Sequence, residues 1–258
     1  MAPGAAMASS KPLAILFALV AGPVAQAQDL PPIAPPPKPE VATAVPPCQP
    51  QSLVSMTVRN ITPGLQAADH RAQPRRIWRK GGRHLRTVEQ PVVAASVQDP
   101  KEPMARQALF IVSEPDVWMI DLASRMGGHT LDKGPVYEVR APILPPGSPP
   151  QFMALEFGCE AEFVAVRAPA AQRTIRWGAV AAGIHTYTVG THSLAILMDD
   201  RSGEPFMITY VRDGRPAHII RYDEYVRGLP DDPDLFRPPA DVKITETSAL
   251  PPGSRPLD

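Results

Sequence analysis

The sequence has very little cysteine and no excess of charge of either sign. Only two cysteines occur in 258 residues, which excludes a disulfide-dense scaffold and leaves no paired CxxC set for a structural zinc site. The 26 Lys and Arg residues balance 26 Asp and Glu residues. A general affinity for nucleic acid is therefore not indicated.

Catalytic and metal-binding signatures are also missing. HExxH, GxSxG, the Walker loop and the EF-hand spacing do not occur, and the six histidines are scattered along the chain. The acidic run Asp231, Asp232 and Asp234 lacks the glycine and the bidentate glutamate of a calcium loop. We therefore predict a protein that is not an enzyme, with no catalytic residue, no metal and no cofactor.

An apolar run with the features of an export signal occurs only near the start. Lys11 precedes the apolar segment 12–24, and Ala25-Gln26-Ala27 follows it. This is the order of charge, apolar core and small cleavage-site residues in a secretory signal peptide. The segment is too short to span a bilayer. We predict a signal peptide at 1–27, a periplasmic mature protein, and no transmembrane segment after cleavage.

Proline is abundant, with 34 residues, and it gathers after the predicted cleavage site. Because proline lacks an N–H and fixes φ, we predict an extended linker at 28–50. It is either an unspecific tether or a ligand for a proline-recognising partner. A β-rich domain at 51–248 and a flexible tail at 249–258 complete the predicted organisation. In an oxidising compartment the two cysteines predict a disulfide between Cys48 and Cys159, with two separate buried thiols as the alternative.

The clearest structural signal is a series of antiparallel strands late in the chain. Asp213-Gly214 predicts a tight hairpin, because that turn needs positive φ. Asp232-Pro233 predicts one capped helical turn after the last strand of the series. Gly127-Gly128 predicts another turn, and the helical spacing from Phe152 to Phe163 predicts a short helix after Pro150, either a movable lid or a packing helix. The strands are predicted at 53–61, within 75–89, at 108–112, 117–122, 135–140, 174–177, 186–189, 193–198, 205–212 and 216–225.

The turn DDRSG, a glycine-containing hairpin, a YDEY strand and the run DPDLFRPPADVKI together resemble the C-terminal part of the Lol-type periplasmic lipoprotein carriers. That group includes mycobacterial lipid-binding lipoproteins and Rse-type envelope-stress sensors. The resemblance implies a mainly β (α+β) fold, a curved antiparallel unclosed β-barrel with one or two short helices. It also implies an apolar cavity for acyl chains. The chain departs from the carriers at its start, where proline takes the place of their first helix.

Two sets of side chains are candidate binding residues. The first set consists of aromatic and aliphatic residues that would exclude water from a cavity: Trp118, Ile120, Phe152, Phe206, Ile208 and Tyr222. The second set is an arginine cluster that would bind the phosphates of lipid headgroups or lipopolysaccharide: Arg75, Arg76, Arg79 and Arg83. The alternative for the arginines is a solvated hairpin face that prevents edge-to-edge strand pairing.

Two functions follow from these patterns. The first is a periplasmic, non-catalytic binding protein that takes a lipid or acylated molecule in the apolar cavity of the half-barrel. The second is an envelope interaction or sensor module without a lipid ligand, which binds a protein partner through strand edges, the basic hairpin and the Pro-rich linker.

Overall fold

The computed structural model describes residues 48–66, 69–89, 108–134 and 137–247. The predicted signal peptide, most of the predicted linker and the predicted tail lie outside these residues. Within them, no helix is long and apolar enough to cross a bilayer.

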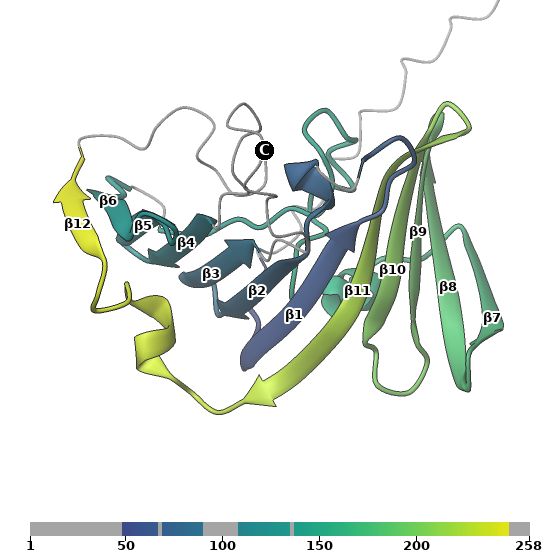
Figure 1. Cartoon of the computed structure of the whole chain (residues 1–258). Coiled ribbons are helices and arrows are strands. Elements are labelled where there is room, and N and C mark those ends of the chain that lie inside the picture. The colour runs from purple at the N-terminus through teal and green to yellow at the C-terminus, as the bar shows by residue number, and fades with distance from the viewer. Residues whose placement is uncertain (1–47, 67–68, 90–107, 135–136, 248–258) are drawn as a thin grey trace, which may run out of the picture. The chain divides into compact units, whose positions relative to one another are not determined.

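Twelve strands form one sheet in the order β12-β6-β5-β4-β3-β2-β1-β11-β10-β9-β8-β7 (Figure 1). Neighbours pair antiparallel except β12 and β6, which pair parallel. Because β7 and β12 stand at opposite ends of this order, the sheet is an unclosed, curved barrel, and the predicted fold class is confirmed. The strands are β1 (Leu53–Asn60), β2 (Arg75–Lys80), β3 (His84–Glu89), β4 (Ala108–Ser113), β5 (Asp116–Asp121), β6 (Met126–Leu131), β7 (Ala171–Trp177), β8 (Val180–Val189), β9 (His192–Asp199), β10 (Pro205–Arg212), β11 (Arg215–Leu229) and β12 (Lys243–Glu246).

Three short helical segments accompany the sheet: η1 (His70–Ala72), α1 (Glu160–Val166) and η2 (Pro233–Phe236). The predicted cap of η2 is present, because the Asp232 carboxylate accepts a hydrogen bond from the backbone N–H of Asp234 at 3.0 Å. The predicted hairpin between β10 and β11 is also present, with Asp213 at φ 51° and Gly214 at φ 74°. Local turn chemistry therefore fixes both ends of β11.

Three predictions of local structure are wrong. The strand expected at 135–140 is absent from its described part, 137–140, which belongs to the segment that packs against the sheet. Gly127 and Gly128 lie within β6 instead of forming a turn. A Cβ on Gly127 would lie 2.7 Å from Cγ1 of Ile120, so this glycine permits a close approach to the neighbouring strand. The helix expected directly after Pro150 begins only at Glu160, because Gly158 has φ +91° and interrupts any helix before it.

The two faces of the sheet are covered by different segments of the chain. We call the face that bears Met56 and Ile208 the inner face. The segment 137–166, which we call the insert, packs against it and contributes buried apolar residues to the larger core cluster. The opposite, outer face bears Leu109 and Ile120, and a smaller cluster there includes Phe236 of η2. The chain thus fills the inside of its own half-barrel.

Candidate functional site

The inner face holds aromatic side chains of the insert where the sequence predicts a ligand. Phe152 is 2% exposed and lies edge-on to Tyr210, with the ring centroids 6.5 Å apart. The ring of Phe157 also lies edge-on to that of Tyr222, with the ring centroids 6.4 Å apart. Leu155 of the insert is fully buried in the same core cluster. The middle of the half-barrel is consequently a packed core in this structure.

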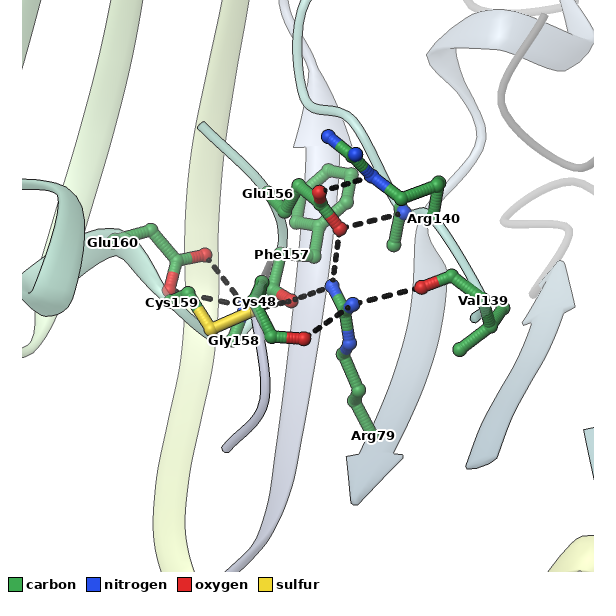
Figure 2. Close-up of polar contacts among 10 residues, drawn as sticks. Cys48, Arg79, Val139, Arg140, Glu156, Phe157, Gly158, Cys159 and Glu160 are labelled. Atoms are coloured by element: carbon green, nitrogen blue, oxygen red, sulfur yellow. Dashed lines mark hydrogen bonds and ion pairs between the residues drawn. A yellow bond between two sulfur atoms is a disulfide. The ribbon is translucent and has the colours of Figure 1, made fainter. Parts of the chain in front are cut away.

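A buried ion pair anchors the insert to β2 (Figure 2). The guanidinium of Arg79 donates to the Glu156 carboxylate at 2.8 Å and to the carbonyls of Cys48, Val139 and Phe157 at 2.9 to 3.1 Å. Both side chains are 1% exposed. Burial lowers the pKa of Arg79, and the Glu156 carboxylate opposes this effect. The pair therefore ties the insert to the sheet instead of offering a charge to a ligand.

A disulfide and a second buried carboxylate complete the attachment. Cys48 is bonded to Cys159, as the cysteine count predicts, and this joins the end of the predicted linker to the start of α1. Glu160 accepts hydrogen bonds from the hydroxyl of Tyr222 at 2.7 Å and from that of Tyr225 at 3.0 Å. Burial raises the pKa of Glu160, and these hydrogen bonds oppose the rise. Figure 2 shows the disulfide and Glu160 beside the Arg79 network.

One end of the inner face stays open and forms a pocket of about 290 Å³. The pocket lies where the end of β1, the starts of β2 and β11, and residues 142–146 of the insert meet. Its apolar lining residues include Val58, Ile143, Leu144, Phe157, Ala217 and Ile220. Its polar lining residues include Asn60, Thr62, Arg71, Gln73, Arg75 and His218. Pockets for small ligands commonly measure about 300 to 1,000 Å³, so this pocket is at the lower limit.

Two cations and a neutral histidine face this pocket. The guanidinium of Arg75 lies 3.6 Å from the Glu89 carboxylate, and burial lowers its pKa. Arg71 donates two hydrogen bonds to Asp69, at 3.2 and 2.8 Å, which raise its pKa. Burial lowers the pKa of His218, an effect that its hydrogen bond with the backbone of Ile143 partly offsets. Both guanidinium groups thus already have carboxylate partners, and an anionic ligand would share them with Asp69 and Glu89.

The six predicted ligand-binding residues do not come together. Phe152, Ile208 and Tyr222 are buried in the core of the inner face. Trp118 and Ile120 belong to the outer-face cluster, because alternate residues of β5 point to opposite faces and Val117 takes the inner position. Phe206 stacks on Trp177 with the ring centroids 6.4 Å apart. None of the six lines the pocket, and binding by these residues stays a prediction.

The four predicted anion-binding arginines are also separated. Arg79 is buried in its ion pair, and Arg75 lines the pocket. Arg76 lies over the ring of Trp78 at 4.9 Å, and Arg83 is exposed in the turn between β2 and β3. A strand alternates its side chains between two faces, so a run of arginines along one hairpin cannot form a single ribbon of charge.

Several important residues were not predicted from the sequence. His218 shares a strand face with Ile220 and Tyr222, so the alternation along β11 was a usable signal for its inward position. No local pattern indicates that Glu156 and Glu160 are buried, because the partners of a buried carboxylate lie far away in the sequence. Among the described residues, no group of three or more His, Cys, Asp or Glu side chains could hold a metal ion.

Comparison with known proteins gives only remote matches. No family model matches the chain, and no curated protein matches it. An uncharacterized conserved protein from Thermus thermophilus is 9% identical, with a TM-score of 0.42, over 76% of this chain and 91% of that chain. MucB in the MucA/MucB complex of Pseudomonas aeruginosa is 11% identical, with a TM-score of 0.40, over 79% of this chain and 63% of that chain. A LolA superfamily protein from Nitrosomonas europaea is 12% identical, with a TM-score of 0.24, over 72% of this chain and 90% of that chain. No function is carried over from them.

Proposed function

We propose that this protein is an exported, non-catalytic binding module that takes an anionic amphiphile, a lipid or another acylated molecule, in the open pocket of its half-barrel. The observation that carries the proposal is the pocket of about 290 Å³, whose lining combines apolar side chains with Arg71 and Arg75. Burial of apolar carbons against Ile143 and Ile220 supplies affinity, and the guanidinium groups select a carboxylate or phosphate. The remainder of a long acyl chain would lie outside the pocket, because the insert fills the rest of the inner face.

The first test is to purify the protein from the periplasm without detergent and to analyse an organic extract by lipid mass spectrometry. A stoichiometric anionic lipid is expected, with none in a control protein prepared in the same way. A fluorescent fatty acid is then titrated against wild type and against Ala217→Trp, which fills the pocket from β11. We expect affinity to fall at least about tenfold in the variant, since the apolar group is displaced.

The control variant is Arg212→Gln, at the exposed last position of β10, which should leave fatty acid binding unchanged. A fluorescent fatty alcohol of the same length tests the role of the cations, and it should bind more weakly than the acid. Equal affinity of wild type and Ala217→Trp for the fatty acid would refute the pocket as the site.

Export is part of the proposal, with a signal peptide at 1–27, a linker at 28–50 and one domain at 51–248. The N-terminal sequence of the mature protein tests it directly. We expect that sequence to begin at Gln28.

A second candidate function is an envelope interaction module that binds a protein partner. It is favoured by two observations: the insert already occupies the middle of the inner face, and β7 ends the sheet with an exposed edge. The decisive test is the binding of a partner segment at that edge.

A further inference from the structure

Strand β7 leaves one edge of the sheet exposed. Among the described residues it pairs only with β8, in an unbroken register from Ala171 opposite Thr186 to Trp177 opposite Val180. Six of its seven residues are exposed, and none is proline or glycine. Sheet edges are usually protected by short length, bulges, proline or a covering segment. The opposite edge, β12, is only four residues long, so β7 is the better protein-binding edge of the two.

The side chains of β7 differ between the two faces of the strand. Arg173, Ile175 and Trp177 share one face, since strand residues alternate. The ring of Trp177 is 42% exposed and lies against Phe206 at an interplanar angle of 24°. An added strand would find an apolar surface here for its own apolar side chains.

The charge at this edge is of one sign along the strand. Arg173 and Arg176 are its only charged residues, and Arg201 lines a shallow depression of about 580 Å³ next to Arg176. None of these three arginines forms an ion pair with any described residue. The nearby Asp199 carboxylate accepts hydrogen bonds from the backbone N–H groups of Arg201 and Ser202. Asp199 lines the same depression, and Asp200 accepts a hydrogen bond from the hydroxyl of Thr174 at 3.4 Å. The positive charge that favours an acidic partner is therefore that of Arg173 and Arg176 on the strand itself.

We propose that β7 is a docking edge for an extended acidic segment of a partner protein, which adds a strand beside it. This inference deepens the second candidate function and is independent of the pocket. Backbone hydrogen bonds to β7 would give affinity, and alternate side chains would give specificity. In a partner strand of alternating acidic and apolar residues, the acidic ones would share the face of Arg176, and the apolar ones would share the face of Ile175 and Trp177, which Arg173 borders. A second copy of the chain fits less well, because two β7 strands would bring four arginines together.

The test uses synthetic peptides of alternating Glu and Val, labelled with a fluorophore, and measures anisotropy against the whole mature protein. We expect saturable binding to wild type. In the double variant R173E/R176E, binding should weaken at least about tenfold, because like charges then face each other. The same variant should gain binding to a peptide of alternating Lys and Val. The matched control R212E/R215E reverses two exposed arginines that flank the β10–β11 turn and should behave as wild type.

Two further measurements distinguish strand pairing from simple attraction of charges. A peptide with the same charge and a central proline cannot extend a sheet, so it should bind much more weakly. Backbone amides of β7 should exchange more slowly when the Glu-Val peptide is bound. Equal binding of the proline peptide, or unchanged exchange in β7, would overturn the proposal. If wild type takes up fatty acid but does not bind the Glu-Val peptide, the docking edge alone is refuted and the pocket stays in place.

Discussion

Arg79 carries a charge at a position with 0% exposure, and four acceptors surround its two terminal nitrogens. Taking a charge out of water costs several kcal/mol, and only a partner of opposite charge with good hydrogen bonds offsets that cost. Glu156 of the insert is the partner of Arg79. Its carboxylate also accepts a hydrogen bond from the backbone N–H of Ala141 at 3.1 Å. The energy of the contact therefore depends on both charges being present.

Replacing Glu156 with Leu should destabilise the protein by about 3–5 kcal/mol, because it leaves the Arg79 charge buried with only carbonyl partners. Urea unfolding in oxidising buffer measures the change. The control is Asp223→Leu in the exposed pair with Arg59, for which we expect about 0–1 kcal/mol. Similar losses in the two variants would contradict the view that burial makes the Arg79 pair important.

The raised pKa of Glu160 predicts that its contribution to the free energy of unfolding decreases as pH rises. A surface carboxylate in an ion pair has a lowered pKa, and its contribution increases as pH rises. The folded pKa of Glu160 is raised above the usual 4.5, first of all by burial, so the folded state keeps its proton at pH values where the unfolded state has lost it. Stability from this group is present below pH 4.5 and falls as pH rises through the folded pKa.

Glu160→Gln removes that titration. The difference in unfolding free energy between variant and wild type should therefore shift in favour of the variant as pH rises above the unfolded pKa. Urea unfolding at a series of pH values measures it. A difference that does not change with pH would show that Glu160 titrates alike in both states.

At the scale of elements, His129 of β6 adds side-chain hydrogen bonds to the backbone pairing that holds β12. His129 donates through Nδ1 to Glu246 and through Nε2 to Asp116, each at 2.8 Å, and its ring stacks on Trp118 at 5.1 Å. Burial lowers the pKa of His129, but the hydrogen bonds with Glu246 and Asp116 raise it by more, and the net shift is upward. The imidazolium thus links β12 to the sheet.

The sign of the pH effect on β12 follows from this raised pKa. Stabilisation by the imidazolium is fully present below the ordinary value of 6.5 and is lost as pH rises through the folded pKa. Amide exchange in β12, corrected for its intrinsic pH dependence, should therefore quicken over that range. His129→Gln should abolish this change, and a change that persists in the variant would assign it to another group.

Some elements could be predicted because short-range chemistry decides them. Asp213-Gly214 demands positive φ, and Asp232-Pro233 caps one turn, so both are readable from adjacent residues. The insert was not readable in this way. Its attachment through Glu156 depends on Arg79 of β2, which lies 77 residues earlier in the chain. Long-range burial of charge leaves no local pattern, which explains why an insert core and an end pocket replaced the predicted single cavity.

For the whole molecule, the disulfide decides how firmly the insert fills the half-barrel. Cys48 and Cys159 are 111 residues apart, and closing so long a loop restricts the unfolded chain strongly. In the double variant C48A/C159A we expect a loss of about 2–5 kcal/mol in unfolding free energy, measured by urea titration beside the oxidised wild type.

The same variant tests whether the insert limits the size of the ligand. In wild type the pocket of about 290 Å³ should give fatty acid affinities that stop rising once the apolar wall is covered. Loosening the insert gives a longer chain access to the inner face beside Phe157 and Tyr222, so affinity in C48A/C159A should continue to rise with chain length. The comparison is made with a series of fluorescent fatty acids under conditions where both proteins are folded. An identical dependence on chain length in the two proteins would mean that Arg79 and Glu156 hold the insert without help from the disulfide.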